Sequence, residues 1–140
     1  MPKLNIFRGL PGSGKTTAAN KMGTIVLSAA DMYSMRDGEY KWTPENSQMG
    51  REWALEILHF CVLHEIDVTI AEVLPTVNSV MRYASIALDK GYDINVVDCE
   101  ISIEQSLERN THNVPIEHIE KMAELWERWE ITNIEGVLDV

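Results

Sequence analysis

Residues 9–16 have the sequence Gly-Leu-Pro-Gly-Ser-Gly-Lys-Thr, and the interpretation of the whole chain starts from this stretch. It fits the pattern G-x-x-x-x-G-K-[ST] without a mismatch. A short apolar run, Leu4 to Phe7, precedes it, and Ala-rich sequence of helical character follows from Lys15. The pattern has a physical meaning only between a strand and a helix, so these flanks count as much as the motif itself.

The glycines of this stretch predict a tight loop that binds phosphate. Without a β-carbon they can adopt backbone angles that turn successive N–H groups inward, toward phosphate oxygens, and the following helix adds the positive end of its dipole. In such a loop Lys15 reaches the β- and γ-phosphates, and the Thr16 hydroxyl coordinates Mg²⁺. The alternative, a plain surface turn, is disfavoured because both flanks also fit. We therefore expect ATP, or another nucleoside triphosphate, and Mg²⁺ as ligands, with the nucleotide held by Gly9, Leu10, Pro11, Gly12, Ser13, Gly14, Lys15, Thr16 and Thr17.

Length and composition indicate one ordinary globular domain over residues 1–140. Hydrophobic residues make up 45% and charged residues 24% of the 140-residue chain, which is typical of soluble proteins. No run approaches the roughly 18 apolar residues that cross a bilayer, and the N-terminus lacks the pattern of a signal peptide. We expect a cytoplasmic location and no membrane partner.

Charge and cysteine usage narrow the function classes. A formal net charge of −10 argues against a broad nucleic-acid-coating surface, because such binding depends on many Lys and Arg side chains. It leaves room for a small basic pocket that admits one strand end or one nucleotide. Cys61 and Cys99 lie in apolar segments without metal-ligand spacing, so we expect reduced core residues.

Alternating β-branched runs and helical segments predict an α/β fold. We expect strands over residues 3–8, 24–27, 68–71 and 93–97, and helices over residues 15–22, 45–64, 77–90, 102–109 and 116–131. This alternation predicts a three-layer P-loop NTPase fold, with a parallel sheet of about four strands and helices on both faces. Its carboxyl edge should gather the phosphate loop with Asp31, Glu72 and Asp98.

Apolar residues at helical spacing predict the buried faces of two helices. On the long helix, Trp53, Ile57, Phe60 and Cys61 recur at helical spacing and are expected to face the core. On the last helix, Ile119, Met122, Trp126 and Trp129 should line one face, with exposed i,i+4 pairs between Glu117 and Lys121 and between Glu124 and Arg128.

Several stretches resemble the small P-loop kinases related to phage polynucleotide 5′-kinase. Residues 8–16 resemble that family's RGLPGSGK[ST], and residues 28–33, Ser-Ala-Ala-Asp-Met-Tyr, resemble its S-x-D-D-[FY]-[FY]. Residues 40–45, Tyr-Lys-Trp-Thr-Pro-Glu, are similar to its Y-x-F-D-P-E. Residues 109–115, Arg-Asn-Thr-His-Asn-Val-Pro, resemble its R-N-x-H-x-V-P, which is an unusually specific signature. The likeness covers nearly the whole chain.

The resemblance implies an ATP-dependent kinase with a C-terminal helical lid over about residues 102–116. Such an enzyme transfers the ATP γ-phosphate to a hydroxyl of a nucleic-acid 5′ end, a nucleoside or a nucleotide. The resemblance also implies that Arg109 contacts the transferring phosphate from the lid, and that His112 supports the lid on the nucleotide side.

The chain departs from this family on the acceptor side. The family's first Asp, which takes the proton of the acceptor hydroxyl, is Ala30 here, and only the second is kept, as Asp31. The family's Asn-Thr pair is Glu72-Val73, and a helical His is Arg51. Because phosphoryl transfer depends mainly on positioning and charge stabilisation, loss of one carboxylate slows such a kinase without necessarily abolishing transfer.

The sequence therefore predicts Lys15, Asp31 and Arg109 as catalytic residues, and Thr16 and Glu72 as metal ligands. Asp31 has an equal alternative as a helix N-cap, and Glu72 as a carboxylate at the start of a turn. Two other functions stay open: a nucleotide-binding pseudokinase or regulatory protein with little transfer activity, and a plain NTPase that uses water as acceptor.

Overall fold

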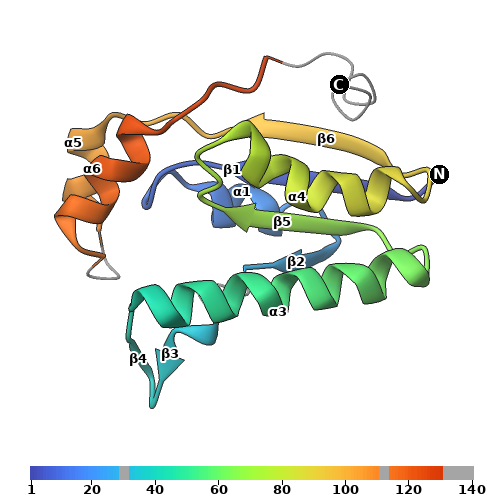
Figure 1. Cartoon of the computed structure of the whole chain (residues 1–140), viewed down its shortest axis with the longest axis horizontal. Helices are drawn as coiled ribbons and strands as arrows, with labels where there is room; N and C mark the ends of the chain where they lie inside the picture. Colours follow the sequence, from blue (N-terminus) through green and yellow to red (C-terminus); the bar gives the residue numbers. More distant parts are fainter. Residues whose placement is uncertain (29–31, 111–113, 131–140) are drawn as a thin grey trace.

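The computed structural model, shown in Figure 1, describes residues 1–28, 32–110 and 114–130. Its centre is a four-stranded parallel sheet in the order β2-β5-β1-β6. The strands are β1 (Lys3–Arg8), β2 (Ile25–Leu27), β5 (Val68–Glu72) and β6 (Asp93–Asp98). All of them therefore end at the same edge. This confirms the predicted α/β P-loop NTPase fold, and the strand bounds agree with the predicted ranges to within one residue.

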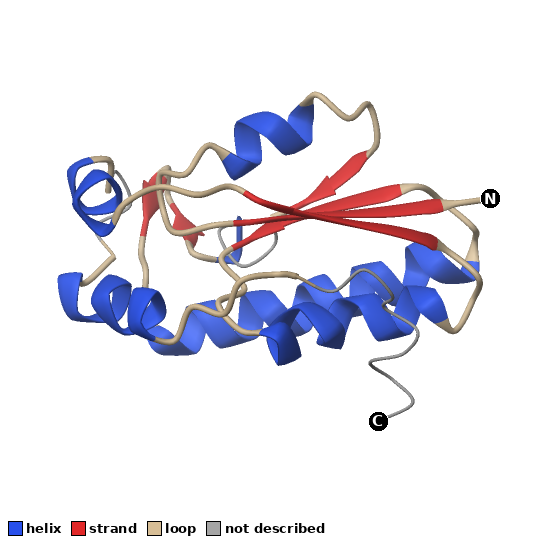
Figure 2. Cartoon of the chain, turned by 90° about the horizontal axis from the view of Figure 1, so that it is seen from above, coloured by secondary structure: helices blue, strands red, loops and turns tan. Residues whose placement is uncertain are grey.

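Helices cover both faces of the sheet, with α1 on one face and α3 and α4 on the other (Figure 2). The strands set this arrangement because successive side chains point to opposite faces. Ile6 packs in the larger core with α3 and α4, whereas Phe7 packs against Ala19 of α1. The helices are α1 (Lys15–Asn20), α3 (Pro44–Leu63), α4 (Val77–Leu88), α5 (Ile103–Glu108) and α6 (Ile116–Glu124). None of the described helices is long and apolar enough to cross a membrane.

Side-chain caps fix where the helices begin. The Thr43 hydroxyl accepts a hydrogen bond from the Asn46 amide at 2.9 Å, with Pro44 as the first helical residue of α3. Thr76 starts α4 through a capping box. The capping box predicted at Ser102 is present and starts α5. These caps satisfy amides that a helix leaves without intrahelical partners.

The predicted core stripe of α3 is partly wrong. Phe60 is 58% exposed and Trp53 40% exposed, while the buried positions of α3 include Ala54, Leu58 and Cys61. The packed face contains small and medium side chains, which let α3 approach α4 closely. The two cysteines follow the prediction in being unpaired thiols, Cys61 buried and Cys99 half-buried.

The last helix is shorter than predicted. α6 ends at Glu124, so Trp126 and Trp129 do not continue its face. Tertiary contacts compete with further helix here, because the Glu127 amide donates to the Pro75 carbonyl at 2.8 Å. The predicted pair of Glu124 with Arg128 does not form, and Arg128 instead pairs with Glu100 at 2.9 Å.

A small hairpin precedes α3. β3 (Met35–Arg36) and β4 (Glu39–Tyr40) pair antiparallel, and the turn between them has Asp37 and Gly38 at φ 52° and 81°. The sequence predicts this turn but not the strands. The hairpin lies at the same end of the molecule as α5 and α6 (Figure 1). It thus places the following residue Trp42 at the carboxyl edge of the sheet.

Candidate functional site

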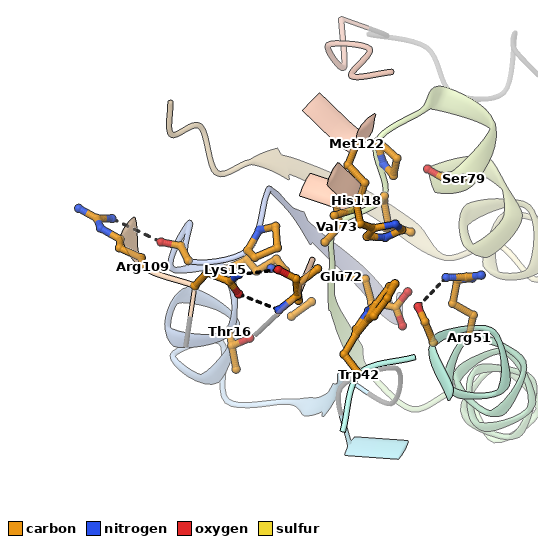
Figure 3. Close-up of a pocket in the computed structure, with 18 of the residues that line it drawn as sticks. Lys15, Thr16, Trp42, Arg51, Glu72, Val73, Ser79, Arg109, His118 and Met122 are labelled. Carbon is orange, nitrogen blue, oxygen red and sulfur yellow. Dashed lines mark hydrogen bonds between the residues drawn. The ribbon is translucent and has the colours of Figure 1, made fainter. Parts of the chain in front are cut away.

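A cavity of about 680 Å³ lies at the carboxyl edge of the sheet. The phosphate loop and the start of α1 form one side of it (Figure 3). The end of β5, helices α3, α4 and α6, the segment around Tyr40 and Trp42, and the segment that follows α5 also contribute to the lining. Its volume falls in the range of pockets that hold small molecules and cofactors.

The phosphate loop has the backbone geometry that its glycines predict. Gly12 and Gly14 have φ angles of 82° and 84°, a region that other residues rarely adopt. A β-carbon on Gly9 would lie only 2.3 Å from the Ser13 Oγ and 2.6 Å from the Cys99 carbonyl. The Ser13 Oγ is buried and has no hydrogen-bond partner within the described residues. Lys15 is the first residue of α1, so the loop leads directly into the helix N-terminus that favours anions.

The α5 helix docks on this loop. The Ser106 hydroxyl donates to the Pro11 carbonyl at 2.7 Å, and the Arg109 Nη1 is 3.4 Å from the Gly12 carbonyl. A β-carbon on Gly12 would lie 2.7 Å from the Arg109 Cβ, so this glycine is needed for the approach. The guanidinium of Arg109 lies on the outer side of the loop, at the left of Figure 3.

Glu72 lies at the end of β5, next to Arg8 in the sheet register, and lines the same cavity as Thr16. It is 6% exposed and accepts a 2.8 Å hydrogen bond from the Tyr83 hydroxyl. Burial, with the negative charge of Glu72, raises the pKa of the Tyr83 phenol, which stays a proton donor. No group of three His, Cys, Asp or Glu side chains suited to a metal occurs in the described ranges. One carboxylate and one hydroxyl nevertheless fit Mg²⁺, which proteins commonly hold through few side chains plus substrate phosphates.

The wall opposite the loop is aromatic and cationic. The rings of Trp42 and His118 lie 4.6 Å apart at an angle of 50°. Arg51, Arg82 and Lys121 also line this cavity, and the Arg51 Nη1 donates to the Ser47 hydroxyl at 2.9 Å. Burial, then the positive charges of Arg51 and Lys121, lowers the pKa of His118 and so favours its neutral form.

A family model described as an AAA domain, AAA_33, matches residues 4–128. The chain belongs to this family. Its members share the P-loop, so the match agrees with the phosphate loop and the fold described above. The match includes all of the described helices and the whole sheet except Lys3, the first residue of β1.

Solved structures with the same fold include chains of larger assemblies. A chain in a structure of the Pnkp1/Rnl/Hen1 RNA repair complex has 20% sequence identity and a TM-score of 0.67, covering 89% of this chain and 43% of that chain. A chain of a second Pnkp1/Rnl/Hen1 complex has 20% identity and a TM-score of 0.60, covering 77% and 38%. APE1195 has 18% identity and a TM-score of 0.59, covering 96% and 86%. This chain thus spans less than half the length of the two Pnkp1/Rnl/Hen1 chains that it matches.

Within this AAA domain, most of the predicted site residues that the structure describes share one cavity, which Lys15, Thr16, Thr17, Glu72 and Arg109 all line. Ala30, Asp31 and His112 lie outside the described residues. Asp98 ends β6 at the carboxyl edge of the sheet, as expected, but it does not line the cavity and pairs with Arg8.

Of the opposite wall, the sequence singled out Arg51, where the kinase family has a His, but it did not single out the rest. Arg82 and Lys121 carry no motif, and their positions follow only from the packing of α4 and α6. A usable signal for Trp42 was its place within the stretch 40–45 that resembles the kinase pattern. Because His118 closely follows Pro115, the sequence predicts that it lies in the first turn of a helix. Nothing in the sequence indicates that its side chain faces the cavity.

Proposed function

We propose that this AAA domain is a phosphotransferase that moves the γ-phosphate of ATP to a hydroxyl of a nucleic-acid 5′ end, a nucleoside or a nucleotide. One observation supports this above others: a single cavity joins the phosphate loop to a separate wall of cationic and aromatic side chains. Two sides of such different chemistry suit two substrates, a nucleoside triphosphate at the loop and a separate acceptor at the wall.

The proposed nucleotide side is the loop of residues Gly9 to Thr17, of which Pro11, Gly12 and Gly14 to Thr17 line the cavity. Their amides and Lys15 would bind the β- and γ-phosphates, as in other phosphate loops. When bound, Mg²⁺ supplies charge stabilisation at the phosphate oxygens, and Thr16 and Glu72 are the residues that would hold it or its water. Arg109 would contact the transferring phosphate after its guanidinium turns from the Gly12 carbonyl toward the cavity, and His112 would support this lid segment.

The acceptor side would be the wall around Trp42 and His118. Their tilted rings offer a surface on which a nucleobase can stack. Arg51 and Arg82 form no ion pair within the described part of the chain, so their charge is available to a phosphate group. In a chain with a net charge of −10, this concentration of cations at one cavity favours an anionic acceptor. One similar chain belongs to an RNA repair complex, which is in keeping with a nucleic-acid end as acceptor.

Transfer also requires removal of the hydroxyl proton. We assign this role to Asp31, the carboxylate that remains beside Ala30. The proton passes to the Asp31 carboxylate as the acceptor oxygen forms a bond to the γ-phosphorus. The bond from that phosphorus to the bridging oxygen breaks, and ADP leaves. A positioned base raises the rate of transfer on the order of 10²- to 10⁴-fold. Asp31 lies one residue after the position of the family's base, so a less well aligned Asp31 would give a slow kinase.

The test is transfer from γ-labelled ATP to a panel of 5′-hydroxyl oligonucleotides, nucleosides and nucleoside monophosphates. We expect label in at least one acceptor class, loss of label in Lys15→Ala, and faster transfer in Ala30→Asp. If no acceptor takes up label although ATP binds, the proposal of a phosphotransferase is wrong.

A pseudokinase or regulatory nucleotide-binding protein is the second candidate, and the combined departures at Ala30, Val73 and Arg51 favour it. It predicts tight ATP binding and no transfer by the natural chain, whereas restored transfer in Ala30→Asp would instead show a disabled kinase. A plain NTPase would instead release phosphate at the same rate with and without an acceptor.

A further inference from the structure

Arg8 is the largest of the fully buried side chains among the described residues, and it directly precedes Gly9 of the phosphate loop. All three nitrogens of its guanidinium are used. Its Nε donates to the Leu74 carbonyl at 2.9 Å, its Nη1 to the Asp98 Oδ1 at 2.9 Å, and its Nη2 to the Glu127 carbonyl at 2.8 Å. Its Cζ also lies 4.2 Å from the centroid of the Trp126 ring. We call these contacts the Arg8 clamp.

The Arg8 clamp holds two parts of the cavity wall. Leu74 lines the cavity between β5 and α4, and its φ of 46° is unusual for a branched side chain, so the loop needs an external contact to keep this shape. Trp126 and Glu127 directly follow α6, which carries His118 and Lys121 into the cavity. The clamp therefore connects the strand before the phosphate loop to the walls on the far side of the cavity.

Further hydrogen bonds tie the clamped segments to one another. The Glu127 amide donates to the Pro75 carbonyl at 2.8 Å, and the Glu127 Oε1 accepts from the Val77 amide at 2.9 Å. The Trp129 amide donates to the Asp98 Oδ2 at 3.2 Å. Movement of the segment after α6 thus requires movement of the loop between β5 and α4, and Arg8 lies where they meet.

Stability alone does not explain why an arginine occupies position 8. Burying a charge is unfavourable, and apolar residues of similar volume often replace a buried ion pair without loss of stability. What an apolar residue lacks is the planar fork of donors, which fixes several acceptors at set directions. Lysine also lacks it, because its ammonium is a single point on a flexible stem.

We propose that Arg8 is a positioning residue, which holds the acceptor wall at a fixed distance and orientation from the phosphate loop. This rests on the proposed phosphotransferase function. Arg8 does not line the cavity and is given no contact with either substrate. It acts through Leu74 and through α6, so that an acceptor hydroxyl is aligned with the bound triphosphate.

The experiment compares Arg8→Lys, Trp126→Leu and the control Arg128→Ala. Arg8→Lys keeps the charge and removes the fork, and Trp126→Leu weakens the clamp from its other end without touching β1. Arg128 lies in the same segment, but its pair with Glu100 has side chains 67% and 59% exposed, so its loss should be neutral. For each variant, transfer kinetics, ATP affinity by calorimetry and amide hydrogen exchange are measured well below the unfolding temperature.

Both clamp variants should lower kcat/KM for the acceptor by ~10²-fold, because misplacement by about 1 Å is enough for such a loss. ATP affinity should stay within ~3-fold, since the loop itself is unchanged. Amide exchange over residues 116–125 should accelerate in both clamp variants, and exchange over residues 15–20 should not. The double variant should lose less than the product of the single losses, because both changes disrupt one clamp.

A purely stabilising role for Arg8 would lower the unfolding temperature and leave acceptor kinetics and the exchange of α6 at their natural values. That result overturns the proposal, and so does an equal effect in Arg128→Ala. If the natural chain transfers no phosphate, the proposed function fails on its own. Exchange over residues 116–125 then still decides whether Arg8 positions the wall. Should Arg8→Lys not fold, Trp126→Leu carries the same comparison.

Discussion

Replacement of Gly12 by alanine tests the contact between the phosphate loop and α5. The new β-carbon would lie 2.7 Å from the Arg109 Cβ, against an ordinary carbon–carbon separation of about 3.5–4.0 Å. The Arg109 Cβ is attached directly to the backbone at the end of α5, so it cannot turn away like the tip of a flexible side chain. The end of α5 must therefore move by about 1 Å.

Two effects lower the free energy of unfolding in Gly12→Ala. A φ of 82° is unfavourable for alanine by about 1–2 kcal/mol. Forcing the added carbon against Arg109 costs about 1–3 kcal/mol more, as overpacking usually does. Gly23 provides the matched control, because its φ is 72° and a β-carbon there would meet no atom within 4 Å. We expect Gly23→Ala to show the first effect alone.

Urea unfolding of the two variants measures the difference. Gly12→Ala should lose about 2–5 kcal/mol of unfolding free energy and Gly23→Ala about 1–2 kcal/mol. The displaced α5 should also weaken ATP binding about tenfold, or about 1.4 kcal/mol, in Gly12→Ala only. Equal losses of stability together with equal ATP affinities would refute the reasoning about this contact.

Two further predictions concern Tyr83, which donates to the cavity residue Glu72, and His118, which lines the cavity. Tyr83→Phe removes the hydrogen bond to buried Glu72 and should lower the unfolding free energy by about 1–3 kcal/mol, and a denaturation midpoint within error of the natural chain would contradict the burial of this pair. Because the pKa of His118 is lower in the folded protein, the unfolded chain binds a proton at this ring more readily. The stability that neutral His118 contributes is therefore present above about pH 6.5, the unfolded pKa, and is lost as the pH falls below it. His118→Gln should therefore flatten the decline in unfolding free energy between about pH 7 and pH 5, and an unchanged slope would show that folding does not lower the pKa of this ring.

Local sequence signals predicted most of the fold. The phosphate loop, the strands and the capping box at Ser102 depend on residues close to one another, so a single segment contains the information. The sequence failed where tertiary contacts decide. α6 stops at Glu124 because the following residues bond to Pro75 and stack on Arg8, and neither contact leaves a pattern in residues 116–131.

The candidate site divides in the same way. Gly12, Lys15 and Thr16 lie in one motif whose spacing has a mechanical meaning, so they could be named in advance. The wall of Trp42, Arg51 and His118 combines residues from three separate parts of the chain. Their meeting depends on how the segment after β4, α3 and α6 pack together, which composition and periodicity do not specify.

Binding of ATP to the phosphate loop is the central claim, and calorimetric titration of the folded chain with ATP and Mg²⁺ tests it most directly. The natural chain should release heat at one site, and at 100 times the dissociation constant ATP should add about 2.7 kcal/mol to its stability. Lys15→Ala should remain folded and lose most of this binding. A folded natural chain that gives neither heat nor a thermal shift would contradict the account.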